Sequence, residues 1–371
     1  MKRKGLSASI AILLLLCLLA GCAAGIEDAA GKDADTIVFT DSCNRQVKLP
    51  ASITRIAPSG AVATMILSTI APEYLVSISG SPSSSQYRYL PEELIKLPTT
   101  GQLYGSKSTI NLEALLSAGP QVIIDLGDPK DGIDKDMDAL QKQTRIPTIF
   151  IRADLDHIAD AYRALGIILS GKGERGEEIA AFIDETITMA RANAAKIYEE
   201  DRISAMYTTG TSGLNTNARG SIQSQVLDLV GVKNAVVVNE VSNKGGGNTI
   251  GMEQLYRFDP DMILFTTGSV YSSAAADQAW SRLSAIKNDA FYEIPGLPYN
   301  WMSNPPSINM ILGIWWLGNL AYPDIYDYDM KEKAKEFYRL FWNYNLTDEE
   351  AAAMLANSTI KAAHTAAIPR L

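Results

Sequence analysis

A weak internal duplication restricts the fold of this chain more than any other feature of its sequence. In the first half, the segment Asn-Leu-Glu at 111–113 is followed by Pro120, seven positions beyond its glutamate, and then by an apolar run. In the second half, Gly-Met-Glu at 251–253 is followed at the same distance by Pro260 and a second apolar run. Each copy predicts a short helix that starts at the glutamate, a proline break and a buried strand. The chain is therefore expected to form two similar lobes.

The two glutamates of the duplication, Glu113 and Glu253, stand 140 positions apart in equivalent places. A single glutamate in the first turn of a helix has an ordinary explanation, because it complements the helix dipole by about 0.3–1 kcal/mol. Matched placement in both copies favours a shared functional role over two separate helix-start preferences.

Short apolar strands alternate with helical patterns on both sides of residue 200, which indicates parallel α/β sheets. After an opening pair at 36–40 and 46–49, the predicted strands are 53–57, 75–79, 122–126, 148–151, 202–207, 235–238, 262–266 and 291–294. The predicted helices are 62–70, 112–117, 137–143, 157–169, 222–230, 254–258 and 278–285.

A long helical pattern at 173–199 separates the two halves. Its apolar residues recur at spacings of three and four, from Ile179 through Ile183 and Ile187 to Ile197, and so define one face of a helix. About 25 residues at 1.5 Å each make a rod of roughly 40 Å. Such a rod joins two lobes stiffly, which a Gly/Ser linker does not.

The N-terminus carries the features of a secretory signal. Lys2, Arg3 and Lys4 precede an apolar run at 10–20, which is too short to span a membrane comfortably. The ending Leu-Ala-Gly-Cys resembles the bacterial lipobox, in which the cysteine, here Cys22, is lipidated and becomes the first residue. The alternative is an uncleaved anchor. Both place the rest of the chain, anchored through its N-terminus, at the outer face of a membrane.

The length and charge of the mature chain narrow its class further. Removing residues 1–21 leaves 350 residues, which suits two lobes better than one core. The removed segment carries three positive charges, so the formal net charge changes from −9 to −12. So acidic a chain argues against nucleic-acid binding. Cys43 has no evident partner and is expected to be a small structural residue.

The expected organisation is a signal peptide at 1–21, a flexible tether at 22–35, an N-terminal α/β lobe at 36–170, an interlobe helix at 171–200 and a C-terminal α/β lobe at 201–371.

The order of these features resembles that of the metal-chelate binding proteins of ABC importers over essentially the whole mature sequence. The residues that carry the resemblance are the opening strand pair, Arg-Ile-Ala-Pro at 55–58, Asn-Leu-Glu at 111–113 with Pro120, Ser-Ile-Gln-Ser-Gln-Val-Leu at 221–227, and Trp301 before Pro-Pro-Ser at 305–307. No one of them is decisive, but their order along the chain is specific.

The resemblance implies the α/β architecture of class III periplasmic binding proteins, with two Rossmann-like lobes joined by a single long interlobe helix. It implies a monomer without enzymatic activity or a cofactor of its own. Such a protein captures a metal chelate (ferric siderophore, haem or cobalamin) in the interlobe cleft and delivers it to an ABC permease dimer with its ATPase. The resemblance also puts Glu113 and Glu253 at the permease interface, where the paired glutamates of that family form salt bridges with arginines.

The ligand of a two-lobed binder lies at the carboxyl ends of its strands, so the loops that follow strands are the places to look. Aromatic rings there stack on a bulky chelate, while Arg, Lys and Asn bind its oxygens. The expected cleft residues are Tyr87, Arg88, Tyr104, Lys107, Tyr207, Asn215, Arg219 and Trp301, and the last loop also offers Asn300 and Asn304. Some of these aromatic residues could instead belong to the core.

Two other functions remain open at this point. An oxyanion such as molybdate would suit a cleft lined by Arg219, Lys107 and serines. The second alternative is a surface lipoprotein enzyme or a chelate sensor. The chain has no Gly-x-Ser-x-Gly, His-Glu-x-x-His or Cys-x-x-Cys motif, which argues against the enzyme. The two histidines, His157 and His364, are too few for the three-histidine site typical of binders of bare zinc or manganese. The segment after Leu346 has no predicted role beyond a last helix.

Overall fold

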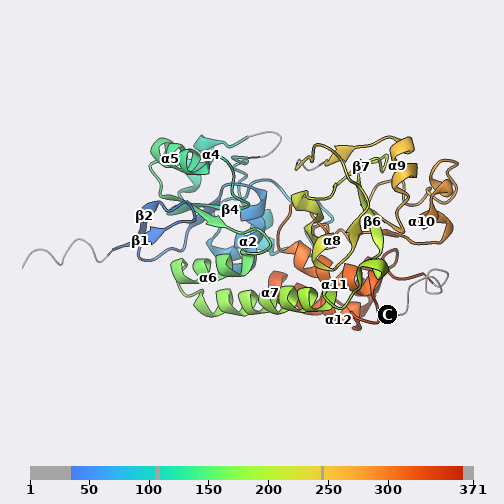
Figure 1. The fold of residues 1–371 in the computed structure, drawn as a ribbon. Coiled ribbons are helices and arrows are strands. Elements are labelled where there is room, and N and C mark those ends of the chain that lie inside the picture. Colours follow the sequence, from blue (N-terminus) through green and yellow to red (C-terminus); the bar gives the residue numbers. More distant parts are fainter. Residues whose placement is uncertain (1–34, 105–108, 244–245, 362–371) are drawn as a thin grey trace, which may run out of the picture.

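Two α/β halves lie side by side in the computed structural model, which describes residues 35–104, 109–243 and 246–361 (Figure 1). The expected signal peptide, the lipidated Cys22 and all but the last residue of the tether lie outside the described residues. Within the described ranges, the chain forms no helix that is both long and apolar enough to span a membrane.

The first half contains a three-stranded parallel sheet in the order β3 (Ile56–Pro58), β4 (Val122–Gly127) and β5 (Thr148–Arg152). All six residues of β4 are buried, as expected of a central strand covered by helices on both faces. The helices of this half are α2 (Ala61–Ile70), α3 (Glu92–Ile95), α4 (Leu112–Ala118), α5 (Ile133–Thr144) and α6 (Ile158–Ile168).

The opening hairpin, β1 (Thr36–Thr40) and β2 (Gln46–Pro50), is antiparallel and is joined to the first half by Asp41. The buried Asp41 carboxylate accepts hydrogen bonds from the N–H groups of Cys43 and Arg45 (3.0 Å each) and of Phe150 in β5 (3.3 Å). Burial and the nearby Asp41 carboxylate raise the pKa of the Cys43 thiol. Cys43 is therefore a protonated structural side chain at neutral pH.

The second half contains a six-stranded sheet in the order β11-β10-β6-β7-β9, with β8 also paired to β6. The strands β6 (Ser204–Thr209), β8 (Lys233–Asn234), β10 (Met262–Phe265) and β11 (Phe291–Glu293) are parallel, whereas β7 (Asn215–Thr216) and β9 (Asn248–Thr249) form an antiparallel extension. The short helices of this half are α8 (Gln225–Leu229), α9 (Met252–Phe258) and α10 (Ser284–Lys287).

The duplicated unit forms the same structure in both halves. Helices α4 and α9 each have seven residues, and each ends at a residue with positive φ, Gly119 at 61° and Asp259 at 32°. Such a left-handed residue terminates a helix and turns the chain. The chain then enters the buried strands β4 and β10 after Pro120 and Pro260, so the prediction of a repeated unit is confirmed.

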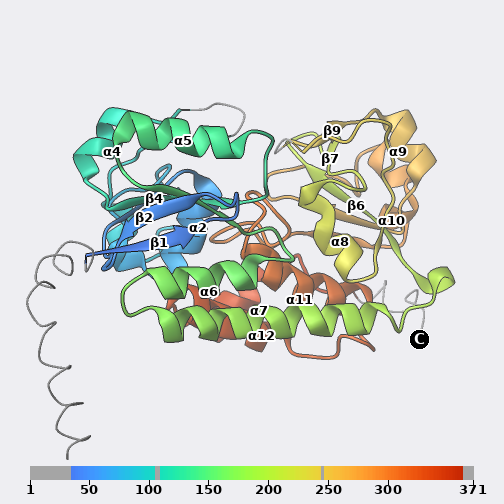
Figure 2. The ribbon, with the colours of Figure 1, turned by 60° about the vertical axis from the view of Figure 1, so that its left-hand side comes forward.

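The long helix α7 (Gly173–Ala194) runs beneath both halves in Figures 1 and 2. Its 22 residues span about 33 Å, somewhat less than the predicted rod. The apolar face expected from the sequence is buried, including Ile179, Ile183 and Ile187. It packs against α6 of the first half and against α8 of the second, so the prediction of a helix that joins two lobes is confirmed.

Two long helices that the sequence analysis did not predict complete the base of the molecule. Helix α11 (Asn309–Ala321) packs on α7, and the Trp315 indole N–H donates to the Thr186 hydroxyl of α7 (3.0 Å). Twelve of the 13 residues of α11 are buried, so its sequence carries no amphipathic period by which it could be recognised.

Helix α12 (Met330–Trp342) returns from the second half to the first. Phe341 packs edge-on against Tyr162 of α6 and Phe182 of α7, and the Arg175 guanidinium donates to the Leu340 carbonyl. Helix α12 also contacts α2. Helix α12 falls within the range predicted for the C-terminal lobe, 201–371, but it packs on elements of the first half. Helix α13 (Asp348–Met354) follows it.

Two predicted strands do not form. Residues 75–79 make only single bridges, from Leu75 to Ile56 and from Ile78 to Thr99. Residues 235–238 leave the sheet just after β8, because the Asn234 side chain accepts from the Val236 N–H (3.0 Å) and bends the chain. The predicted helix 278–285 is also interrupted, since Leu283 is extended between a 3-10 turn at Trp280–Arg282 and α10.

Candidate functional site

A cavity of about 350 Å³ lies at the carboxyl ends of β6, β10 and β11. This edge of a parallel sheet is where α/β proteins bind ligands, because every strand there delivers a loop to the same place. The cavity, here called the strand-end pocket, is lined by Thr209, Gly210, Asn215, Gly246, Thr266, Thr267, Gly296, Asn300 and Asn304. All of these residues come from the second half.

The side chains of the strand-end pocket are hydroxyls and carboxamides without formal charge. The Thr209 hydroxyl donates to the Gly246 carbonyl (3.1 Å), which fixes the glycine loop beside the end of β6. The Asn300 side-chain oxygen accepts from the N–H groups of Met302 (2.9 Å) and Ser303 (3.2 Å). Its NH₂ group bonds to no described residue, so it remains able to donate to a ligand. The lining can therefore offer several neutral donors and acceptors.

A second cavity, here called the annex, adjoins the strand-end pocket, with Thr267 and Gly296 lining both. Its volume is about 400 Å³. Its other lining residues are Ser85 of the first half, Glu293 of β11, the residues Ile294, Pro295 and Leu297 that follow it, and Ala353, Met354, Asn357 and Ser358 of the C-terminal segment. Unlike the strand-end pocket, the annex includes apolar side chains and one carboxylate among its lining residues.

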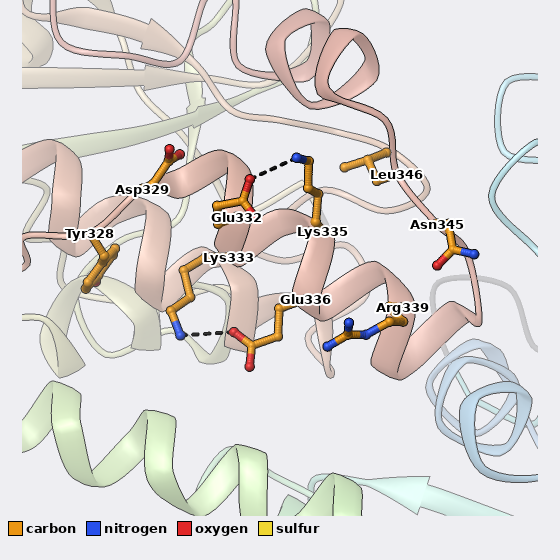
Figure 3. A pocket seen from close by; sticks show the side chains of 9 residues that line it. All are labelled: Tyr328, Asp329, Glu332, Lys333, Lys335, Glu336, Arg339, Asn345 and Leu346. Carbon is orange, nitrogen blue, oxygen red and sulfur yellow. Dashed lines mark hydrogen bonds and ion pairs between the residues drawn. The ribbon is translucent and has the colours of Figure 1, made fainter.

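A larger groove of about 530 Å³ lies along α12, away from the strand ends (Figure 3). Its charged side chains are three acids and three bases. Figure 3 shows Lys333 bound to Glu336 (3.0 Å) on one side of the helix and Lys335 bound to Glu332 (2.8 Å) on the other. These pairs satisfy one another at the protein surface. We therefore place the ligand site at the strand ends despite the greater size of this groove.

The first half has a buried carboxyl group near the end of its own sheet. Asp125 of β4 is hydrogen-bonded to the Ser59 hydroxyl, in the loop that follows β3, and its second oxygen has no partner among the described residues. Burial raises the pKa of Asp125, an effect that the nearby Lys130 ammonium only partly offsets. Ser59 in turn accepts from the Leu103 N–H through its carbonyl (2.8 Å). Asp125 thus positions loops rather than facing the strand-end pocket.

Glu113 and Glu253 are exposed residues of α4 and α9. Both views in Figures 1 and 2 place α4 and α9 on the side of the molecule opposite α7, one in each half. The Asn111 side chain caps α4 by accepting from the Ala114 N–H (3.0 Å). Neither glutamate forms an ion pair with a described residue, so both carboxylates are accessible to a partner.

Sequence and structure comparisons identify the family. A family model described as periplasmic binding protein matches residues 57–297. The chain belongs to the periplasmic binding protein family. The match and the relatives below confirm the resemblance to ABC importer substrate-binding proteins and the two-lobed α/β architecture.

Three proteins illustrate the similarity of this binding protein to others. An uncharacterized ABC transporter substrate-binding lipoprotein, YvrC of Bacillus subtilis, is 21% identical over 88% of this chain and 99% of its own length. An ABC transporter solute binding protein from Sulfurospirillum deleyianum is 26% identical, with a TM-score of 0.79 over 86% of this chain and 99% of that one. MolA of Haemophilus influenzae, solved with molybdate, is 17% identical, with a TM-score of 0.65 over 84% and 99%.

Four of the residues expected at the cleft lie at the strand-end pocket of the binding protein, among them the lining residues Asn300 and Asn304. Asn215 lines it directly and accepts from the Thr249 hydroxyl through its side-chain oxygen (3.2 Å). Tyr207 is fully buried in β6, but its hydroxyl reaches the Asn300 side chain (3.4 Å). Tyr207 therefore supports a lining residue and does not offer its ring to a ligand.

Three other expected cleft residues are held elsewhere. Trp301 is 1% exposed and packs in the core beside Phe337 and Tyr338, so its ring is not available for stacking. The Arg219 guanidinium donates to the Asn234 carbonyl (2.9 Å) and does not line the pocket. The Tyr104 hydroxyl donates to Asp136 (2.9 Å), and the Lys130 ammonium lies over its ring (4.2 Å).

The serine-rich loop at 81–89 lies between the halves. Arg88 forms an ion pair with Glu350 and donates to the Tyr344 hydroxyl (3.1 Å), so it contacts the C-terminal helices and not the strand-end pocket. Tyr87 is exposed and lines neither the strand-end pocket nor the annex. Lys107 lies outside the described residues.

Thr266 and Thr267 line the pocket after β10 but were not among the expected cleft residues. The rule that loops after strands hold the ligand covers them, because the strand at 262–266 was predicted. The expected residues were aromatic, charged or carboxamide side chains, whereas Thr266 and Thr267 carry only hydroxyl groups.

Proposed function

We propose that this protein is an extracytoplasmic, lipid-anchored binding protein that captures a metal chelate in the strand-end pocket and delivers it to an ABC permease dimer with its ATPase. Membership of the periplasmic binding protein family supports the binding role. The lipobox at Cys22 and the likeness to a substrate-binding lipoprotein support the anchor.

The observation that favours a chelate is the size and character of the two adjoining cavities. About 350 Å³ of pocket, lined by hydroxyls and carboxamides, lies beside about 400 Å³ of annex, whose lining adds apolar side chains such as Ile294, Leu297 and Met354. Cavities in the range of roughly 300–1,000 Å³ hold ligands of drug size. A chelate presents both oxygen atoms and organic surface, so it matches a lining that combines polar and apolar side chains.

The permease-docking part of the proposal rests on Glu113 and Glu253. Two unpaired carboxylates, one in each half and on the same side of the molecule, would meet a partner that carries two separated positive charges. Charges so placed set the orientation and rate of association more than its affinity.

The ligand is tested by titrating the mature chain with haem, cobalamin, several ferric siderophores and molybdate, and following thermal unfolding. At one hundred times the dissociation constant, a true ligand adds about 2.7 kcal/mol to the free energy of unfolding. Thr266→Val, which removes one pocket hydroxyl, should weaken the binding of that ligand. Thr54→Val, at an exposed site, is the matched control. If none of these compounds stabilises the protein against thermal unfolding, the chelate proposal is contradicted.

A second candidate is an oxyanion. The hydroxyl and carboxamide groups of Thr209, Thr266 and Asn300 can donate to oxyanion oxygens without a positive charge. A tetrahedral oxyanion would leave the annex to water, which is why we rank it second. Stabilisation by molybdate alone in the same titration would reverse this order.

A further inference from the structure

We propose that the annex is a second ligand subsite, which takes a cationic, amine-bearing arm of a ligand whose remaining part occupies the strand-end pocket. This inference deepens the proposed function and depends on it for the occupant of the strand-end pocket. The inference about the annex itself rests on its own geometry.

The annex is placed to receive an extension of a pocket-bound ligand. Thr267, after β10, and Gly296, after β11, line both cavities. Any Cβ at position 296 would lie 3.1 Å from the Thr267 hydroxyl, closer than side chains ordinarily approach. Because residue 296 is a glycine, no side chain from this position separates the two cavities. A ligand can therefore extend across this boundary without a change in the fold.

Glu293 gives the annex its electrostatic preference. It is the one charged side chain among the described residues that line the annex. The Asn357 side chain donates to its Oε2 atom (3.0 Å), and no described lysine or arginine forms an ion pair with it. A carboxylate that is held in place and lacks a cation favours a positively charged group and disfavours an anion. The annex therefore selects an ammonium or a similar cation.

One part of the annex lining suits a hydrocarbon chain. Leu297, Ala353 and Met354 present apolar surface beside Glu293. The Met354 sulfur lies 3.3 Å from the Tyr338 hydroxyl oxygen, and that hydroxyl donates to the carbonyl of Leu297. An alkyl stem that ends in an ammonium would cover the apolar walls and reach the carboxylate, as lysine side chains do at protein surfaces.

The C-terminal segment, which had no predicted role beyond a last helix, builds one wall of this subsite. The Glu293 N–H donates to the Asn357 carbonyl (3.0 Å), and the Ser358 carbonyl accepts from the Trp316 indole N–H (2.8 Å). These bonds hold the segment after α13 against β11 and α11. The wall is thus a fixed part of the fold, and the subsite exists before the ligand arrives.

The experiment uses two small probes of opposite charge, n-hexylammonium chloride and sodium hexanoate, at equal ionic strength. The mature chain carries ¹³C-methyl methionine, and the Met354 signal is assigned from a Met354→Leu variant. We expect hexylammonium to shift the Met354 signal and to bind about threefold to fivefold more tightly than hexanoate, the preference expected of one partly exposed ion pair. Glu293→Gln should abolish that preference.

Glu185→Gln, on the exposed face of α7, removes the same charge far from the annex and should leave the preference unchanged. Equal binding of the two probes, a preference that survives in Glu293→Gln, or a Met354 signal that neither probe shifts would overturn the proposal. No chelate is present in this experiment. If the annex prefers hexylammonium but no chelate binds, the subsite stands and the proposed function is rejected. If a chelate binds but the annex shows no preference for hexylammonium, the proposed function stands and the subsite is rejected.

Discussion

The residues that line the strand-end pocket have uncharged side chains or none. The ends of the strands set the position of the pocket. Its shape also depends on residues that pack behind the lining residues. Gly313 of α11 is one such contact, because a Cβ at this position would overlap the Trp301 carbonyl oxygen. That carbonyl lies directly after Asn300, whose side chain lines the pocket.

Gly313→Ala is therefore expected to destabilise the protein, although alanine is the better helix former. The gain in helix propensity is about 1 kcal/mol, whereas forcing a methyl group into a packed interior costs roughly 1–3 kcal/mol. Chemical denaturation should show a net loss of stability. Gly80→Ala, where a Cβ meets nothing within 4 Å, is the control and should change stability little. A Gly313→Ala protein as stable as the wild type would show that α11 can move away from the pocket loop.

Asp125 predicts a pH dependence of stability. Burial raises its pKa above the unfolded value, so the folded state favours the protonated carboxyl group. This contribution to stability is complete below the unfolded pKa, near 3.9, and is lost as the pH rises through the folded pKa. Asp125→Asn removes the titration, so the stability of the variant relative to the wild type should increase between pH 4 and pH 8. A relative stability that stays constant over this range would contradict the prediction.

At the element scale, the unpredicted helices α11 and α12 matter most. A helix that is apolar on all sides, such as α11, has no periodic spacing of apolar residues by which to recognise it. In an amphipathic helix such as α7, the spacing of apolar residues predicts the buried face. Helix α12 is amphipathic, with Phe337 and Phe341 stacked on its buried side (4.3 Å between ring centroids). This pattern is typical of an amphipathic helix, although the helix was not predicted, and it does not specify the half on which α12 packs.

Phe341→Ala should therefore destabilise the first half as well as the second. Removing a fully buried phenylalanine typically lowers the free energy of unfolding by about 3–5 kcal/mol. Arg339→Ala, on the exposed side of the same helix, should change it by less than about 0.5 kcal/mol. Urea denaturation followed by hydrogen exchange in α2 and α6 would measure both effects. Unchanged protection of those two helices in Phe341→Ala would contradict the packing described here.

At the scale of the whole molecule, the two halves are joined by more than the interlobe helix. Helix α7 and helix α12 both contact elements of each half, and the Gln86 side chain donates to the Pro298 carbonyl between them (2.8 Å). Several contacts between the halves restrain their relative movement more than a single connecting segment would. Such contacts limit changes in the separation of the two exposed glutamates, which suits the proposed docking on a partner with two fixed sites.

The double variant Glu113→Ala/Glu253→Ala is expected to abolish uptake of the ligand by whole cells, because it removes both charges of the proposed docking pair. Ligand affinity of the purified variant should be unchanged, since neither residue lines the strand-end pocket or the annex. Glu185→Ala serves as the matched control on the opposite side of the molecule. Normal uptake by the double variant would exclude the docking role.

The amino-acid sequence alone predicts the repeated helix–strand unit, the parallel sheets, the long helix and the positions of Glu113 and Glu253. These features follow from local patterns of proline, glycine and apolar spacing, which act over a few residues. Such patterns do not predict that Trp301 is buried, that Arg88 pairs with Glu350 or that α12 packs on the first half, all of which the folded structure shows. A residue's burial and partners depend on segments distant in sequence, and no local pattern in the chain specifies which segments those are.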